Sequence, residues 1–202
     1  MSRYRGPKLR KIRSLGTLPG LTRKDPANQN PPGEHGGRWH RRRSSTYRLQ
    51  LTEKQKIRFN YGLSEKQLRR YYSKATSMKG ETGHNLLQQI ERRLDNVVAR
   101  GGFTRSIPAA RQLVTHGHVT VNGRKLDIPS YSVRVGDVIS LKEKSRKLKV
   151  IEDNITEGSG IGVPAFLDVD PSARKIIMKA LPSREDVPLD VDERMVVEFY
   201  SK

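Results

Sequence analysis

Apolar residues recur at helical spacing through the middle of the chain. The clearest stripe runs over residues 85–100, where leucine, isoleucine and valine return every three or four positions. Shorter stripes of the same period precede and follow it. The pattern predicts helices over residues 53–61, 65–78, 85–100 and 107–116.

The residues at the ends of these segments support the helix boundaries. Thr52 with Gln55, and Ser64 with Gln67, have the spacing of a capping box, in which hydroxyl and amide each bind an unpaired backbone group. Pro108 suits the first turn of a helix, where its missing N–H is not needed. A glycine follows each predicted helix closely, as expected at a C-cap.

After the fourth predicted helix the apolar period changes to two. Residues 118–126 alternate around Asn122-Gly123, a dipeptide typical of a two-residue hairpin turn because both positions need positive φ. Apolar residues between 133 and 141 predict a further strand. We therefore predict that residues 92–152 form a module of two helices and a small antiparallel sheet.

The last quarter of the chain gives weaker signals. Residues 158–162 are rich in glycine, but no Lys-Ser/Thr pair follows as in a phosphate-binding loop, so we predict a linker over residues 153–169. Residues 195–200 alternate like a strand and are too apolar for an exposed tail. We expect this terminal segment to pack back on the helices at 53–78.

Length and composition exclude several classes of protein. The chain has 202 residues, which allows one or two small domains, and no cysteine, which excludes disulfides, thiolate nucleophiles and cysteine-bound metals. No apolar run approaches the ~20 residues of a membrane-spanning helix, so we expect no membrane partner. Motifs of serine hydrolases, zinc proteases and nucleotide phosphate loops do not occur, and we predict that the protein is not an enzyme.

The charge is large and unevenly distributed. Lysine and arginine number 40 against 21 acidic residues, a formal net charge of +19. Residues 1–80 carry net +17, residues 81–151 carry +7 and residues 152–202 carry −5. This distribution favours a polyanionic partner, and nucleic acid fits better than an anionic membrane because the first 48 residues lack a continuous apolar helix face.

Residues 1–48 combine their charge with 11 glycines and prolines. We predict a basic extended arm that its partner orders, the alternative being a solvated disordered tail. Seven of the 12 aromatic residues lie among the cations of the first two fifths of the chain, and aromatic rings stack on unpaired RNA bases. The alternative, that Phe59, Tyr61 and one of Tyr71 and Tyr72 belong to the core, stays open.

Three polar clusters suggest other chemistry. His116 and His118 could bind a metal but lack a nearby third ligand, so contact of His116 with phosphate or sugar is favoured. Glu91 and Asp95 have the one-turn spacing of a carboxylate pair, yet neighbouring arginines favour ion pairing. The acidic residues after 168 lack the spacing of a calcium loop and are better explained by pairing with the chain's own cations or with a basic protein neighbour.

Several stretches resemble the bacterial and organellar family of small-subunit ribosomal protein S-four, over nearly the whole length. These are residues 1–8, Pro32-Gly33-Glu34-His35-Gly36, and residues 53–56, 92–98, 110–116, 121–124, 128–131 and 197–202. Residues 92–152 are similar to the family's namesake RNA-binding domain, which recurs in pseudouridine synthases and a tyrosyl-tRNA synthetase. The chain has no room for the further domains of those enzymes, and a small RNA chaperone would not need the basic helical extension.

The resemblance implies a mixed α/β (α+β) fold, with the 92–152 module inserted into a mainly helical domain of residues 49–91 plus about 170–202. It implies a structural component of the small ribosomal subunit that binds a multi-helix junction in the 5′ domain of the subunit's RNA, early in assembly. It also implies a position near the path by which mRNA enters, beside ribosomal protein S-five, with an influence on translational accuracy. The location would be the cytoplasm of a bacterium, or alternatively a plastid ribosome.

The predicted RNA contacts are mostly cations of the basic regions. They are Arg3, Tyr4, Arg5, Lys8, Arg10, Arg13, His35, Arg41, Arg42, Arg43, Lys54, Lys56, Arg58, Arg69, Arg70, Tyr72, Arg93, Arg105, Arg111, Gln112, His116, Arg124 and Lys125. On the module we expect Arg111 and Thr115 to share the polar side of the 107–116 helix, close to Arg124. Some relatives bind zinc through cysteines near the N-terminus; this chain has none, so no cofactor is expected apart from magnesium ions associated with the RNA.

Overall fold

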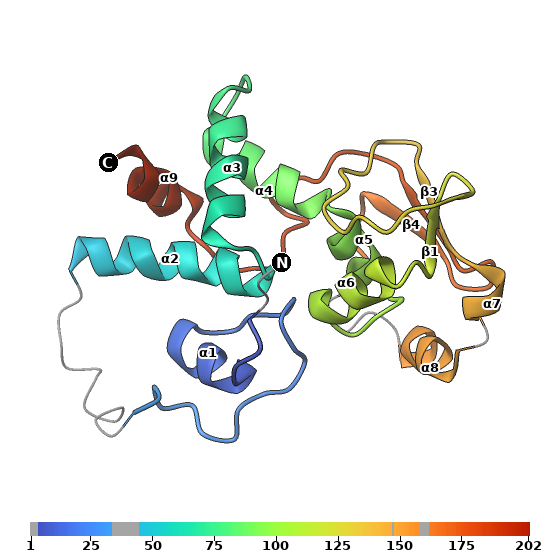
Figure 1. Ribbon diagram of the computed structural model, residues 1–202. Helices are drawn as coiled ribbons and strands as arrows, with labels where there is room; N and C mark the ends of the chain where they lie inside the picture. Colours follow the sequence, from blue (N-terminus) through green and yellow to red (C-terminus); the bar gives the residue numbers. More distant parts are fainter. Residues whose placement is uncertain (1–3, 34–44, 147, 158–161) are drawn as a thin grey trace. The chain divides into compact units, whose positions relative to one another are not determined.

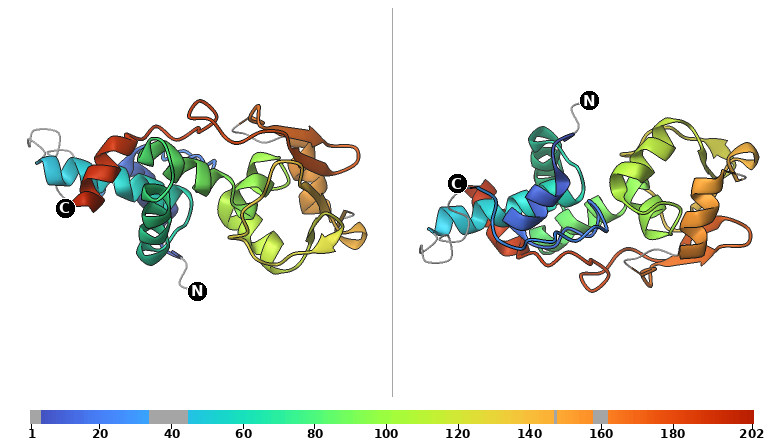
Figure 2. Two further views of the ribbon diagram at one scale, coloured as in Figure 1. Left: turned by 90° about the horizontal axis from the view of Figure 1, so that it is seen from above. Right: turned by 90° about the horizontal axis from the view of Figure 1, so that it is seen from below.

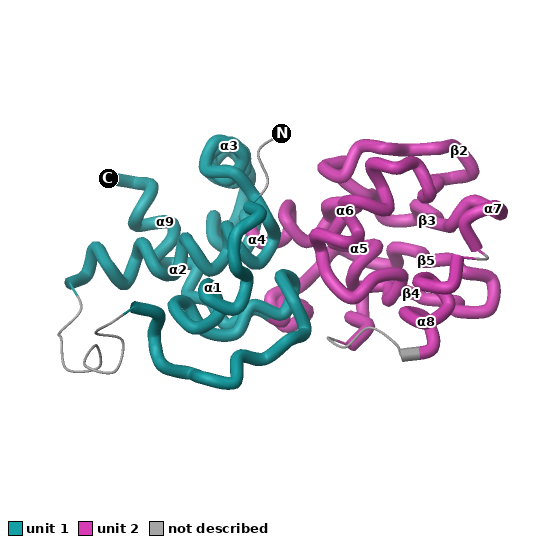
Figure 3. The backbone as a smooth tube through the Cα atoms, turned by 60° about the horizontal axis from the view of Figure 1, so that its bottom comes forward, with its two compact units in different colours: residues 1–86, 189–202 teal, residues 87–188 magenta. Residues whose placement is uncertain are grey.

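The computed structural model describes residues 4–33, 45–146, 148–157 and 162–202. The chain divides into unit 1, residues 1–86 with 189–202, and unit 2, residues 87–188 (Figure 1, Figure 3). Unit 1 is built of helices, and unit 2 adds an antiparallel sheet. The predicted mixed α/β class is confirmed.

Unit 1 joins helices from both ends of the sequence. They are α1 (Lys8–Leu15), α2 (Thr46–Asn60), α3 (Glu65–Thr76), the first part of α4 (Thr82–Glu91) and α9 (Glu193–Ser201). The capping box of α3 is confirmed, since the Gln67 N–H donates to Ser64 Oγ (3.3 Å) and the Ser64 N–H donates to Gln67 Oε1 (3.0 Å). The capping box predicted at Thr52 is wrong, because Ser45 already caps α2 by accepting the Arg48 N–H.

The N-terminal arm is more folded than its composition predicts. Residues 8–15 form α1, so an extended arm is wrong for this segment. Ile12, Leu18 and Leu21 are buried, and the Gly20 N–H donates to Asn60 Oδ1 at the end of α2 (2.8 Å). These contacts pack the first part of the arm within unit 1, and burial of the three apolar side chains favours that packing.

The C-terminal segment is a helix, and the predicted strand is wrong. Asp192 caps α9 by accepting the Arg194 and Met195 N–H groups, and a short apolar run fits either period. The expected return to the helices is confirmed: α9 lies beside α2 in both views of Figure 2, and Gln50 Nε2 donates to Glu198 Oε2 (2.7 Å).

The long helix predicted over residues 85–100 is divided into α4 and α5 (Leu94–Arg100). Arg93 between them is extended and pairs with Ser132. The Leu94 N–H donates to the Tyr131 carbonyl (2.9 Å) and the Asp95 N–H donates to the Pro129 carbonyl (3.1 Å). The 129–133 segment thus binds backbone groups that a continuous helix would have paired internally.

Unit 2 contains a sheet larger than the predicted one. Beside the rest of α4, it holds α5, α6 (Ile107–Thr115), α7 (Glu143–Arg146), α8 (Lys149–Glu157) and the strands β1 (Val119–Val121), β2 (Arg124–Lys125), β3 (Val138–Leu141), β4 (Leu167–Asp170) and β5 (Lys175–Met178). The strand order is β2-β1-β3-β5-β4, and all neighbours are antiparallel. The hairpin turn has positive φ at Asn122 (49°) and Gly123 (78°), as predicted.

The linker predicted over residues 153–169 is wrong over most of its length. Residues 153–157 belong to α8, residues 167–169 belong to β4, and residues 158–161 lie outside the described part. β5 pairs with β3, so residues 170–188 belong to unit 2 and not to the helical unit. A Cβ on Gly101 would collide with the Ile176 side chain, which shows how closely the end of α5 approaches this sheet.

Candidate nucleic-acid interface

One exposed polar surface of unit 2 lies along α6 and the β1–β2 hairpin. Arg105, Gln112, His116, Arg124 and Lys125, all predicted contacts, have exposed side chains there. We call these five residues the hairpin surface. The Lys125 side chain lies over the turn that ends α6, because a Cβ on Gly117 would collide with Lys125 Cε. The hairpin thus brings its cations back to the end of α6.

Arg93 and Arg111 are not part of this surface. Asp95, fully buried, accepts hydrogen bonds from Arg93 Nε (3.0 Å) and Nη2 (2.8 Å) and from Arg111 Nε (2.9 Å) and Nη2 (2.7 Å). The prediction that Arg111 shares the exposed polar side of α6 with Thr115 is wrong: Arg111 is buried and only Thr115 is exposed. The helical pattern predicts that arginine, as a polar residue, faces solvent. The pattern contains no information about the buried carboxylate of Asp95, which pairs with Arg111 in the interior.

The ion pairing favoured for the two carboxylates is confirmed. Glu91 is buried, accepts from Asn96 Nδ2, and has Arg100 Nε 3.9 Å from its Oε2. The partner of Glu91 is therefore Arg100 from the next helix, whereas Asp95 pairs with Arg93. Both carboxylates stabilise the α4–α5 region of unit 2.

A second exposed basic surface lies on α3. Arg69 and Arg70 were predicted, and Lys66 and Lys74 are exposed on the same helix. We call these four residues the α3 stripe. Positions 66, 70 and 74 repeat every four residues over about 12 Å of helix, a spacing that could have identified the two lysines from sequence.

Lys54 is a predicted contact that the structure places in the interior of unit 1. Its ammonium is 3.1 Å from Glu65 Oε2 and 4.4 Å from the centre of the Phe199 ring. The Tyr200 hydroxyl donates to Glu65 Oε1 (2.8 Å). Lys54 therefore fixes α9 against α2 and α3 through an ion pair and a cation–π contact.

The pKa values of this cluster reflect its composition. Burial opposes the charge of Glu65, but the Tyr200 hydrogen bond and the Lys54 ammonium outweigh it and lower the pKa of the carboxyl below its ordinary 4.5. Burial, reinforced by the Glu65 carboxylate, raises the pKa of the Tyr200 hydroxyl far above its ordinary value. Glu65 therefore stays ionised and Tyr200 stays protonated at neutral pH.

The remaining predicted contacts in unit 1 differ in exposure. Tyr4, Arg5 and Arg10 are exposed, whereas Lys8, Arg13, Lys56, Arg58 and Tyr72 are partly buried. Several have protein partners: Arg13 Nε donates to the Asn30 carbonyl (2.8 Å), and Lys56 is 2.8 Å from Glu53 Oε1. Arg3, His35, Arg41, Arg42 and Arg43 lie outside the described residues.

The aromatic residues among the cations mostly pack on one another. Tyr61 is buried, Phe59 contacts the Tyr4 ring edge-on at 5.2 Å between centres, and Tyr72 lies 5.0 Å from the Tyr200 ring. The core interpretation therefore holds for Tyr61, and Tyr72 faces another tyrosine. Tyr4 is 42% exposed and keeps a surface on which a base could stack.

The described part of the chain shows neither a metal cluster nor a membrane helix. The rings of His116 and His118 lie 6.2 Å apart, and no group of three His, Cys, Asp or Glu side chains that could hold a metal occurs in residues 4–33, 45–146, 148–157 and 162–202. Within the same ranges no helix is long and apolar enough to cross a bilayer.

Comparison with known proteins identifies the family. A family model described as the ribosomal protein S4/S9 N-terminal domain matches residues 3–91, and the S4 domain matches residues 92–139. The small ribosomal subunit proteins uS4 of Synechococcus elongatus and Prochlorococcus marinus (strain AS9601) are each 52% identical to the chain over 202 residues, covering 100% of it and 99% of the relative. The chain belongs to the uS4 family.

As a uS4 family member the chain is a structural protein of the small ribosomal subunit and not an enzyme. The match to the S4 domain begins at Arg92, at the junction between α4 and α5, and ends at Ile139 in β3. β4 and β5, which complete the sheet, lie beyond the matched residues.

Proposed function

We propose that this uS4 family member binds the RNA of the small ribosomal subunit directly, at a multi-helix junction of the RNA's 5′ domain, early in assembly. The observation that carries the proposal is the hairpin surface, where exposed cations stand beside exposed hydrogen-bonding groups of α6. Cations supply sequence-independent affinity for phosphates, and Gln112 and His116 can contact sugars or bases.

Binding to RNA fragments tests this proposal. The full chain should bind a transcript of the 5′ domain more tightly than a 3′-domain transcript of equal length. Changing Arg124 and Lys125 together to glutamine should lower the slope of log K against log salt by about 1 for each cation removed.

The matched control changes Lys144 and Lys149 to glutamine, since these lysines are exposed in unit 2 but lie outside the hairpin surface. The control should leave the slope closer to that of the wild type. Equal affinity for the two transcripts would contradict the proposed RNA target, and equal slopes for the two double variants would contradict the proposed surface.

We further propose that the protein neighbours ribosomal protein S-five near the path by which mRNA enters, and influences translational accuracy from there. The family resemblance supports this position, and so does the acidic region that ends the chain, where Asp190 and Asp192 are exposed. Charge reversal at Asp190 alone, since Asp192 caps α9, should weaken cross-linking to purified S-five and change the read-through of a stop-codon reporter. Unchanged cross-linking would contradict the contact.

We propose that the protein needs no metal of its own and that magnesium arrives with the RNA. The chain has no cysteine for zinc. Elemental analysis of the purified chain should find less than one equivalent of zinc, and stoichiometric zinc would contradict the proposal.

The proposed location is a bacterial cytoplasm, with a plastid ribosome as the alternative, and the relatives named above are cyanobacterial.

A further inference from the structure

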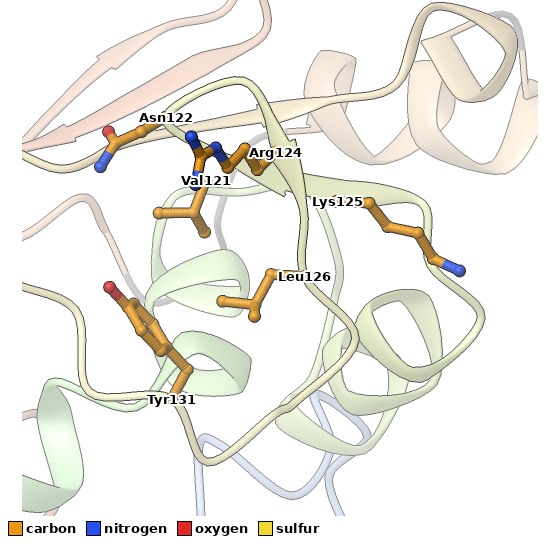
Figure 4. A pocket seen from close by; sticks show the side chains of 6 residues that line it. All are labelled: Val121, Asn122, Arg124, Lys125, Leu126 and Tyr131. Carbon is orange, nitrogen blue, oxygen red and sulfur yellow. The ribbon is translucent and has the colours of Figure 1, made fainter.

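A pocket of about 420 Å³ opens between the β1–β2 hairpin and the loop that follows it. It is lined by Val121, Asn122, Arg124, Lys125, Leu126 and Tyr131. Figure 4 shows the Val121, Leu126 and Tyr131 side chains around one space, with Arg124 above them and Lys125 directed away. The volume lies within the ~300–1,000 Å³ typical of small-ligand clefts.

Hydrogen bonds within unit 2 position Tyr131 beside the pocket. The Tyr131 carbonyl accepts the Leu94 N–H (2.9 Å), its N–H donates to the Ile128 carbonyl (3.1 Å), and its hydroxyl donates to Asp137 Oδ2 (3.5 Å). The backbone of Tyr131 is thus tied to α5 and to its own turn, and a long hydrogen bond joins its side chain to Asp137. A fixed ring costs little entropy when a second ring stacks on it.

The acidic group nearest to the ring is already paired. Asp137 is buried and accepts hydrogen bonds from Asn122 Nδ2 (2.8 Å) and the Arg134 N–H (2.8 Å), besides the Tyr131 hydroxyl. Asp127 is exposed in the adjoining loop but does not line the pocket. The pocket therefore combines an apolar floor with an arginine at its edge, and Lys125 extends beside it.

Tyr131 also differs from the other aromatic residues of its unit. Unit 2 contains three phenylalanine or tyrosine residues, and Phe103 and Phe166 are buried in the core. Tyr131 is partly exposed and faces the pocket. An aromatic ring beside cations is the arrangement by which proteins receive unpaired RNA bases.

We infer that this pocket receives one unpaired base of the bound RNA, stacked on Tyr131 with its phosphate near Arg124. The inference rests on the proposed RNA-binding function and adds a base-stacking subsite beside the hairpin surface. Stacking tolerates any base, so the subsite selects an unpaired nucleotide and not a sequence. Selection of unpaired nucleotides favours a junction over a continuous duplex.

The test combines protein variants with an abasic RNA. Chemical probing of the wild-type complex with the 5′-domain transcript first identifies an unpaired base that becomes protected. Removing that base should weaken wild-type binding on the order of tenfold. Tyr131→Leu should show a similar loss with the intact RNA and no further loss with the abasic RNA, whereas Tyr131→Phe should behave as the wild type because it keeps the ring.

Thermal melting of each variant, and an Arg134→Gln variant that changes an exposed cation outside the pocket, serve as controls. If Tyr131→Leu does not fold, ultraviolet cross-linking of the wild-type complex replaces it as the test. The protected base should then form a cross-link to Tyr131. An abasic penalty equal in wild type and Tyr131→Leu, cross-links only to other residues, or filling of the pocket by a neighbouring protein would overturn the inference. Junction binding by the wild type with no coupling at Tyr131 would leave the proposed function intact and remove only the subsite.

Discussion

Single carboxylates decide which cations of this protein can reach RNA. Asp95 forms ion pairs with Arg93 and Arg111, and Glu65 forms one with Lys54. Three of the predicted RNA contacts are therefore buried and stabilise the protein itself. Gln112, which follows Arg111 in the sequence, remains exposed. A count of basic residues therefore overstates the RNA-facing charge.

Asp95→Asn should destabilise the protein by about 3 kcal/mol or more, because two buried guanidinium groups lose their counter-charge. Chemical denaturation at neutral pH measures this loss. The matched change Asp127→Asn concerns an exposed carboxylate and should have little effect. Similar losses for the two variants would show that the buried ion pairs contribute little.

Glu65 should make stability depend on pH. Its pKa is lower in the folded protein than its ordinary 4.5, so its contribution is fully present above that value and is lost as the pH falls through the lower, folded value. Glu65→Gln should be less stable than the wild type at pH 7, and the difference should shrink in acid. Denaturation midpoints at a series of pH values check this, and a difference that does not vary with pH would contradict it.

At the scale of elements, α9 completes the helical unit. It covers Lys54 and places Phe199 and Tyr200 on α2 and α3. A deletion of residues 193–202 would leave Lys54 without its aromatic contacts and remove the two side-chain partners of Gln50, which is buried on α2. The terminal helix is thus part of the unit's core, although the whole of unit 2 separates it from its neighbours in the sequence.

Deleting residues 193–202 should lower the melting temperature by about 5 °C or more, since a loss of ~2 kcal/mol corresponds to several degrees in a chain of this size. Removing Lys202 alone, which costs one hydrogen bond to Gln50, serves as the control. Calorimetry distinguishes the two. An unchanged melting curve for the longer deletion would contradict the role of α9.

At the scale of the whole molecule, charge and shape contribute differently to RNA binding. Residues 1–48 carry 13 basic and two acidic residues, and long-range charge raises affinity for any RNA. The hairpin surface has hydrogen-bonding groups that can distinguish one RNA structure from another. Because α1 packs within unit 1, deleting the arm would remove core residues as well as charge, so substitutions separate the two effects better.

Changing Arg5, Arg10 and Lys24 to glutamine should lower the slope of log K against log salt by up to about 0.7 to 0.9 for each phosphate that is no longer neutralised, and leave the preference for the folded junction intact. Changing Gln112 and His116 to alanine should reduce that preference with little effect on the slope. Filter binding at several salt concentrations measures both quantities. Loss of discrimination in the arm variant would mean that the arm itself reads the RNA.

The sequence alone determined several features that depend on neighbouring residues, although it misplaced the cap of α2 and predicted a strand where α9 forms. The α3 capping box, the Asn122-Gly123 turn and α6 follow from local hydrogen bonding and backbone preference, and the resemblance to the family rests on contiguous stretches. Tertiary contacts decided the rest. The 129–133 segment divides α4 from α5, and β3 pairs with β5 across the predicted linker. The buried carboxylate of Asp95 holds Arg93 and Arg111 in the interior, and the half-exposed carboxylate of Glu65 pairs with the buried Lys54. Each of these outcomes depends on a partner distant in sequence, which no local pattern contains.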